Sequence, residues 1–462
     1  MTIINDILNE IKEQNIKFVD LRFTDSLGHQ HSLTYDADFI DGAVLENGVV
    51  FNSSAITGWQ DIEASDMLLK PDLSSFVLDP FANSKTAILI CNVLCTSTMQ
   101  NYNRDPRSIA KKAEKFLHDY ANGSYINFGC ELEFFLFDSV EFSNKINSSS
   151  YEVKINEFQS HVQSVNSSHP IKSALQVQPV DQSFNIRSEI IEILKSLNIE
   201  TKGHHHEISP GQNEISFAPT SLLKCADNIQ MAKYVIKNVA HSYGKKASFM
   251  AKPIATGNGN SMPLNQAIFK AGKNLFFGSN YAGLSDVAIF YIGGVLKHCR
   301  ALNAFTNPTT NSYARFTNLN TVPKFISYSD NNRSTAIKVP YSAQGKDKSI
   351  EIRFPDSSAN IFLALSSILM AGLDGVINKI SPGAPEDRNL FNLSMSDLNK
   401  PETLSLSLEE SLKSLSEDKD FLLKDNVFTD DQLNSYIKIK QDEVEYIKSR
   451  PNPEEYETYF SN

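Results

Sequence analysis

The stretch Phe128–Asp138, FGCELEFFLFD, decides the fold, because it has the pattern of a buried strand and yet carries two carboxylates. Seven of its eleven residues are apolar. Side chains two residues apart point to the same face of a strand, so Glu131 and Glu133 share a face. An edge strand with this face in water fits less well, because Phe135 and Phe137 continue it. Two like charges on a buried strand need a counter-charge, so we expect a metal ion or another cation beside them.

The overall composition bounds the class of protein. The 462 residues are enough for a large core and for two or more domains. The net charge of −11, without a long basic run, argues against nucleic acid as a partner. Residues 1–10 lack the basic and apolar regions of a secretory signal, and the apolar run at 361–373 is short for a bilayer. We therefore expect no membrane partner and a cytoplasmic protein.

The cysteines do not indicate a disulfide framework or a zinc knuckle. Their number is odd, their positions are scattered, and no two have CxxC spacing. We expect free thiols at Cys91, Cys95, Cys130, Cys225 and Cys299.

The periodicity of apolar residues predicts a small sheet domain followed by a larger helical and stranded region. The chain should open with a helix over 4–11 and a hairpin over 17–35, and the segment 51–59, with the only Trp, has the pattern of a polar surface loop. Residues 139–170 should be irregular and residues 384–420 peripheral. Further helices are expected at 108–120, 181–197, 225–243, 285–305, 361–380 and 430–447.

Two further acidic residues, Glu207 and Glu214, lie in a predicted hairpin. A turn at Ser209–Gln212 would set Glu207 opposite Glu214. The three histidines before Glu207 could be an accidental surface tract, but beside a facing carboxylate they favour a site. Carboxylate oxygens suit hard cations, so we expect these two residues to converge with the first acidic pair.

Two further features are open to more than one interpretation. The loop 256–261 has the backbone freedom to hold an anion or a carboxylate, although a short Gly/Asn loop is weak evidence alone. Glu351 and Arg353 share a face of a predicted strand. They belong either to the same site or to an ordinary ion pair.

Motifs spread along the whole chain carry a family resemblance. They are the segments NRDPRSIA at 103–110, HHHE at 204–207, GQNE at 211–214, NPTTNSY at 307–313, NRS at 332–334, EIRFPD at 351–356 and MAGLDG at 370–375, together with the Glu131/Glu133 strand. In these segments the chain resembles a type I glutamine synthetase. The resemblance implies an α+β fold, with a small β-grasp-like domain at 1–103 and a larger catalytic domain at 104–462. It also implies a dodecamer of two stacked hexameric rings, with each active site between neighbouring subunits.

The resemblance further implies a reaction and a set of site residues. In that family ATP phosphorylates the glutamate γ-carboxylate and ammonia displaces the phosphate, with two Mg²⁺ or Mn²⁺ ions in the site. By this resemblance one metal is held by Glu133, Glu207 and Glu214, and the second by Glu131, Glu351 and a histidine. Glutamate is expected at Asn258, Gly259, Arg315 and Arg353, the transferring phosphoryl group at Arg333, and the nucleotide at Lys338 and Asn265.

The chain departs from the family pattern on the metal and phosphate side. The second metal's histidine aligns with Pro263, whose side chain has no lone pair to donate. The family's next histidine is replaced by Asn265, and a serine nearby by Ala267. Lys338 replaces an arginine, which keeps the charge and loses the planar fork.

The ammonium side departs as well. The aspartate that helps to bind ammonium reads Asn52, and the flap glutamate reads Thr321. A neutral amide is no proton acceptor near neutral pH, and losing one general base costs about 10²–10⁴-fold. A pocket tyrosine aligns with Ala174, and the tyrosine that carries nucleotidylation aligns with Phe391.

Three hypotheses follow. The chain is a working glutamine synthetase, a ligase of glutamate with another amine, or a catalytically impaired member that serves as a binding or regulatory subunit. The losses cluster in functional loops while the scaffold motifs persist, which favours the impaired protein. In that case it forms either a homo-dodecamer or an assembly mixed with an active paralogue.

Overall fold

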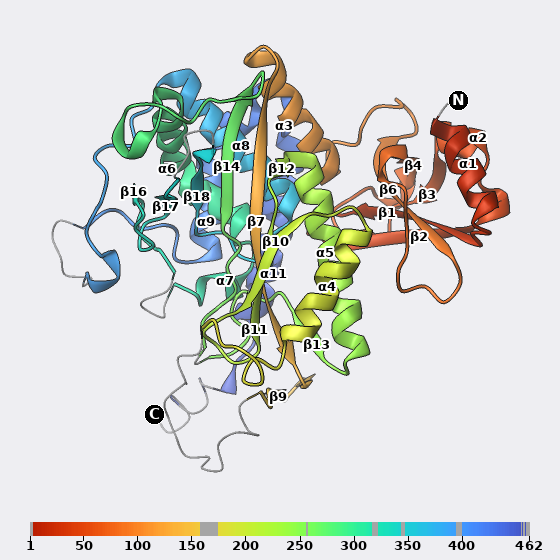
Figure 1. Ribbon diagram of the computed structural model, residues 1–462, viewed down its shortest axis with the longest axis horizontal. Helices are drawn as coiled ribbons and strands as arrows, with labels where there is room; N and C mark the ends of the chain where they lie inside the picture. The colour runs from red at the N-terminus through yellow and green to blue at the C-terminus, as the bar shows by residue number, and fades with distance from the viewer. Residues whose placement is uncertain are drawn as a thin grey trace.

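A small N-terminal sheet domain stands beside a larger body built on one long sheet (Figure 1). The computed structural model describes residues 3–157, 174–255, 257–316, 322–342, 347–393, 400–453, 455 and 458. Each part has its own apolar core, centred on Leu21, Leu69 and Leu89 in the small domain and on strand β7 in the large one.

The N-terminal domain confirms the predicted opening helix and hairpin. Its sheet has the order β2-β1-β6-β4-β3, with β5 paired to β6, and β1 and β2 are antiparallel. The elements are α1 (Ile3–Glu13), β1 (Phe18–Thr24), β2 (Gln30–Asp36), α2 (Gly42–Asn47), β3 (Val49–Asn52), β4 (Asp66–Pro71), β5 (Val77–Leu78) and β6 (Thr86–Cys95). The five cysteines of the chain are free, as predicted.

The prediction that residues 51–59 form a polar surface loop was wrong at its two aromatic positions. Phe51 lies in β3 and Trp59 is only 5% exposed. The Trp59 ring contacts Phe23 and Tyr102, with centroids 5.6 and 5.4 Å apart. Phe51, Trp59 and the partly buried Ile56 cover the apolar side of β1, although the segment also carries several polar residues.

The large sheet carries the predicted acidic strand near its centre. Its order is β10-β11-β7-β14-β18-β17-β16, with β12 and β13 paired to β7 and β15 to β14. The bounds are β7 (Ser124–Phe137), β10 (Thr201–His206), β11 (Gln212–Phe217), β12 (Thr220–Ser221), β13 (Lys246–Ser248), β14 (Leu264–Lys270), β15 (Lys273–Asn274), β16 (Tyr328–Asp330), β17 (Ile337–Val339) and β18 (Ile350–Ile352).

The segment after β7 is more regular than its composition predicts. An irregular excursion was expected over 139–170, but β8 (Ser139–Lys145) and β9 (Ser148–Lys154) form an antiparallel hairpin. Residues 158–170 lie outside the described part of the chain. The many Ser and Asn residues, whose abundance is typical of a loop, are found here because most of this hairpin is exposed to water.

Helices pack against the large sheet and against one another. They are α3 (Pro106–Tyr120), α4 (Phe184–Ser196), α5 (Leu222–Ser242), α6 (Asp286–Thr306), α7 (Thr310–Tyr313), α8 (Ile361–Asn378), α9 (Leu408–Glu417), α10 (Asp420–Leu423) and α11 (Asp430–Lys448). All the predicted helices are therefore present. The two central helices approach closely at Gly294 of α6 and Gly375 of α8, where a Cβ would overlap the backbone of the other helix.

Helix α8 is the core of the large body. Among the described residues it is the one helix long and apolar enough to cross a bilayer, and 83% of it is buried. Its length of 18 residues exceeds the apolar run considered in the sequence, so burial and not length identifies it as a core helix. The expectation that residues 384–420 are peripheral was wrong for α9, because Leu408, Leu412 and Leu415 are buried in the same core.

Among the contacts that join the small domain to the large body are those of two buried polar side chains, Asn360 and Arg107. Asn360 caps the N-terminus of α8, and its Nδ2 donates to the carbonyls of Asp25 and Ser26 at 3.0 and 3.2 Å. The buried Arg107 guanidinium contacts Asp72 of the small domain and Asp227 of α5, each at 2.8 Å. The turn of the first hairpin is therefore fixed to the end of the core helix.

Replacing Asn360 tests this contact. Asn360→Ala removes both the cap and the bonds to the hairpin turn, so we expect a loss of about 2 kcal/mol in the local opening free energy of the first turn of α8. Asn360→Ser keeps a capping oxygen and should cost about half as much. Hydrogen exchange at the amides of Phe362 and Leu363 measures both values. Protection in Asn360→Ser equal to that of the wild type would contradict the separate contribution of the hairpin contact.

Candidate functional site

Three charged side chains form a row across three adjacent strands. Glu133 of β7 lies directly opposite Glu214 of β11, and Glu214 lies opposite His205 of β10. Strand neighbours in register place their side chains about 5 Å apart on one face. The strand pairing therefore brings together two of the predicted carboxylates and a histidine.

The predicted pairing of Glu207 with Glu214 was wrong by two residues. The turn at Ser209–Gln212 is present, since the Gln212 N–H donates to the Ser209 carbonyl at 3.0 Å. However, the Gln212 carbonyl accepts from Glu207 at 2.9 Å, so Glu207 faces Gln212. Gln212 thus belongs to strand β11 and the connecting loop is 208–211, with Gly211 at a φ of +69°, which shifts the register in a way that the turn sequence alone does not reveal.

Glu207 nevertheless reaches the row through the histidine. His205 Nε2 lies 2.9 Å from Glu207 Oε1 and 3.8 Å from Glu214 Oε2. One ligand atom from each of these three residues lies within 4.8 Å of the others. This spacing and these donor types are typical of a divalent-cation site.

The electrostatics of the row follow from burial. Burial raises the pKa of Glu133 well above its ordinary value, and the charges of Glu207 and Glu214 raise it further. Burial also raises the pKa of Glu214, to about 7. Burial is also the largest single influence on Glu207, but the hydrogen bond and charge of His205, the Ile208 N–H and the charge of Arg333 together outweigh it and lower the pKa of Glu207. The carboxylates thus repel one another, and a cation among them would relieve that repulsion.

The second acidic pair, Glu131 and Glu351, already has partners within the protein. Asn265 Nδ2 donates to Glu131 Oε1 at 3.1 Å. Lys338 Nζ lies 2.8 Å from Glu351 Oε2, and Arg353 binds the other oxygen of Glu351. Of the two alternatives for Glu351 and Arg353, the structure shows the ion pair. Glu351 makes a second ion pair with Lys338 on the adjacent strand β17.

A cavity of about 270 Å³ lies over both acidic sets. Arg333 and Arg353 line it together with Asn258 and Gly259. Four carboxylates line the same cavity. The cavity therefore has two guanidinium groups beside a cluster of acidic groups that could bind a cation. The acidic residues are Glu131, Glu133, Glu207 and Glu214.

Comparison with known proteins gives the family. A family model described as the glutamine synthetase catalytic domain matches residues 103–459, and one described as the glutamine synthetase beta-Grasp domain matches residues 15–96. The chain belongs to the glutamine synthetase family. Its fold is accordingly a β-grasp domain followed by the larger α+β catalytic domain.

Relatives of this family match over their full length. A glutamine synthetase of Pasteurella multocida is 43% identical over 468 residues, covering 100% of this chain and 99% of its own. A protein of Cupriavidus pinatubonensis named 3-hydroxylaminophenol mutase is 44% identical, with coverage of 99% and 98%. The structure of Plasmodium falciparum glutamine synthetase superposes with a TM-score of 0.88 at 27% identity, with 99% of each chain covered.

The divalent cations that the family implies fit one set of residues and not the other. Glu133, Glu207 and Glu214 are crowded like charges with His205 in reach, so they suit a cation. At Glu131 and Glu351 the third position is Pro263, whose carbonyl accepts from the Glu131 N–H at 3.0 Å and whose side chain offers no ligand. That second set, with its carboxylates already in contact with Asn265, Lys338 and Arg353, does not fit the family's second metal.

Several residues expected at the family site lie elsewhere in the single chain. Arg315 is 1% exposed, and its guanidinium donates to Ser261 and to the carbonyl of Phe354, behind the cavity wall. Asn52 lies in the N-terminal sheet and accepts from Ser54, outside the acidic cavity. Thr321 lies outside the described residues. Ala174 is exposed, whereas Phe391 lines the cavity.

Sequence reasoning missed the residues that hold the carboxylates in place. Gln212 Nε2 donates to Glu133 Oε2 at 3.0 Å, and the Ser261 N–H donates to the same oxygen at 2.7 Å. The buried Glu157 accepts from His206 Nε2 at 3.0 Å and from the Gly211 N–H, and thereby fixes the turn after Glu207. The His-rich segment was noted in the sequence, but nothing in the pattern linked it to Glu157.

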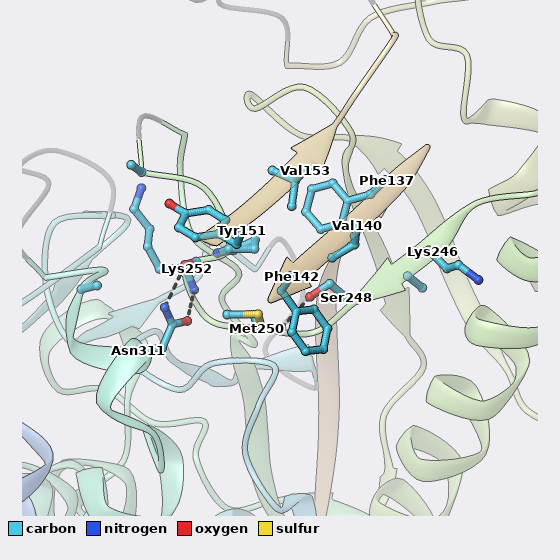
Figure 2. Close-up of a pocket in the computed structure, with 14 residues that line it drawn as sticks. Phe137, Val140, Phe142, Tyr151, Val153, Lys246, Ser248, Met250, Lys252 and Asn311 are labelled. Atoms are coloured by element: carbon cyan, nitrogen blue, oxygen red, sulfur yellow. Dashed lines mark hydrogen bonds between the residues drawn. The ribbon is translucent and has the colours of Figure 1, made fainter. Parts of the chain in front are cut away.

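A larger apolar cavity of about 830 Å³ lies away from the acidic site. Figure 2 shows aromatic and aliphatic side chains of the β8–β9 hairpin lining it, among them Phe142, Tyr151 and Val153. Asn311 stands opposite and makes two hydrogen bonds with the backbone of Lys252. The lining holds no acidic side chain, so this cavity is not the candidate cation site.

Glu157→Ala tests how the turn is positioned. The substitution leaves His206 and the Gly211 N–H without their acceptor, so the turn that carries Glu207 should loosen. We expect the affinity for Mn²⁺ to fall about 10- to 100-fold, as for other residues that orient metal ligands. Electron paramagnetic resonance of free Mn²⁺ measures it. The matched control is Glu152→Ala on the exposed face of β9, and equal affinities in the two variants would refute the positioning role.

Proposed function

We propose that this chain is an impaired member of the glutamine synthetase family. It binds glutamate and ATP with one Mg²⁺ or Mn²⁺ ion and ligates ammonia slowly or not at all. The observation that carries the proposal is the state of the second acidic pair, whose carboxylates contact Asn265, Lys338 and Arg353 while Pro263 stands in place of a ligand. The family's two-metal arrangement is thereby reduced to one.

The residues that line the cavity support binding. Glu133, Glu207 and Glu214 would hold the cation, which when bound neutralises phosphate oxygens. Arg333 is exposed at the cavity and would contact a transferring phosphoryl group, where a planar fork stabilises developing negative charge. Asn258 and Arg353 would orient glutamate. Lys338 and Asn265, expected on the nucleotide side, are engaged with Glu351 and Glu131 instead.

Loss of proton acceptors explains slow ligation. Ammonium must lose a proton before it attacks, and Asn52 and Thr321 stand where the family has carboxylates. Neither side chain accepts a proton near neutral pH. Losing each base lowers the rate about 10²–10⁴-fold. The phosphorylated glutamate would then react only with ammonia that arrives already deprotonated.

Assembly is part of the proposal. Asn52 lies outside the acidic cavity of its own chain, which supports sites that form between neighbouring subunits of a dodecamer, either uniform or mixed with an active paralogue. The exposed Phe142 and Tyr151 of the β8–β9 hairpin also support contacts between subunits.

The free thiols support a cytoplasmic location, because thiols stay reduced there. The domain boundary at residues 103/104 falls between β6 and α3.

A second candidate is ligation of glutamate with an amine other than ammonia. The changed ammonium side favours it, and a relative named 3-hydroxylaminophenol mutase, 44% identical, carries a different activity name from the glutamine synthetases. Fold and family therefore do not fix the reaction. A neutral amine would not need the carboxylates that Asn52 and Thr321 replace.

The ammonium-dependent rate tests the impairment. With saturating ATP, glutamate, ammonium and Mg²⁺, phosphate release should be far below the ordinary enzyme rate of about 10 s⁻¹. The variant Asn52→Asp with Thr321→Glu should raise it by about 10²-fold or more, because both proton acceptors return. Asn47→Asp, the same chemical change at an exposed site on α2, should leave it unchanged. Wild-type turnover near 10 s⁻¹ would refute the proposal.

A panel of amines separates the two candidates. Phosphate release is measured with ammonium, methylamine, ethanolamine and a polyamine in turn. We expect no amine to raise the rate above that with ATP and glutamate alone. A large increase with one amine other than ammonium would support the second candidate and overturn the first.

A further inference from the structure

Four polar side chains on neighbouring strands form two contacting pairs beside the cation site, Lys338 with Glu351 and Asn265 with Glu131. In the ladder, Glu351 of β18 is paired with Lys338 of β17 on one side and with Asn265 of β14 on the other. Lys338 Nζ reaches Glu351 Oε2 at 2.8 Å, and Asn265 Nδ2 reaches Glu131 Oε1 at 3.1 Å. The strand register therefore delivers an ammonium group to the second acidic pair.

The charges of this group balance without a metal. Glu131 and Glu351 carry two negative charges, and Lys338 and Arg353 carry two positive ones. The Glu351 and Arg353 side chains are only 5% and 9% exposed, and that of Lys338 is 21% exposed. A divalent cation entering here would have to displace the Lys338 ammonium from Glu351, and Pro263 would offer it no ligand in return.

Lysine is suited to this role by its shape. Its ammonium is a compact point charge on a flexible stem, whereas a guanidinium spreads its charge over a planar fork. At 2.8 Å from Glu351 Oε2, this compact cation occupies an oxygen that could otherwise ligate a metal ion. The Pro263 side chain, which cannot ligate a metal, needs no partner in such an arrangement.

We propose that the Lys338 ammonium is the resident cation of this half of the pocket, and that at Glu351 it takes over the charge-neutralising part of a second divalent ion. This inference rests on the proposed one-cation function and extends it. The charge of this half of the pocket is then independent of the metal concentration, and only the set with Glu133, Glu207 and Glu214 responds to added cation.

Anomalous diffraction from crystals soaked in Mn²⁺ tests the proposal. The wild-type protein should show one Mn²⁺ peak, at Glu133, Glu207 and Glu214, with the Lys338 ammonium still on Glu351. Pro263→His alone supplies a ligand but leaves the ammonium in place, so it should also show one peak. Pro263→His combined with Lys338→Met frees the position, and a second peak should appear between Glu131 and Glu351.

A matched control removes the same charge elsewhere. Pro263→His with Lys273→Met, on the exposed strand β15, should show one peak. A second peak in the wild type, in Pro263→His alone or in this control would overturn the role of Lys338, as would a single peak in the Lys338→Met double variant. If that double variant does not fold, the wild-type map alone decides. Absence of the first peak would instead contradict the proposed function.

Discussion

Mutual repulsion among the carboxylates on one sheet face is the constraint on which the rest of the site depends. Strands β7, β11 and β18 place Glu131, Glu133, Glu214 and Glu351 there, and Glu207 joins from the end of β10. Buried like charges persist only with counter-charges. The molecule meets this requirement in two ways, with an open cation site on one side and ion pairs on the other.

The division between the two halves follows strand pairing. Glu133 and Glu214 are direct neighbours and have a histidine as the next residue across the sheet, so their charge remains available to a ligand. Glu351 on β18 has Lys338 on the adjacent strand β17 as its direct neighbour. The ion pair at this ladder position thus occupies a carboxylate oxygen, whereas the residue paired with Glu133 is Glu214, not a lysine.

Much of the fold could be predicted from local pattern, and the errors share a physical cause. Strand β7, the first hairpin and the long helices follow from periodicity alone. The register of Glu207 does not, because the turn is fixed by Glu157, far from it in sequence. Trp59 is buried because another strand needed a cover, and the bond from Lys338 to Glu351 depends on how β17 and β18 align. Side-chain partners that come from distant parts of the sequence cannot be predicted from a local pattern.

Calorimetry measures most directly how many divalent cations bind per chain. Mn²⁺ is titrated into the purified, fully assembled protein without nucleotide, and the heat is fitted for stoichiometry and affinity. We expect one dominant site per chain. Two tight and equal sites per chain would contradict this expectation, because the second acidic pair would then be as open to metal as the first.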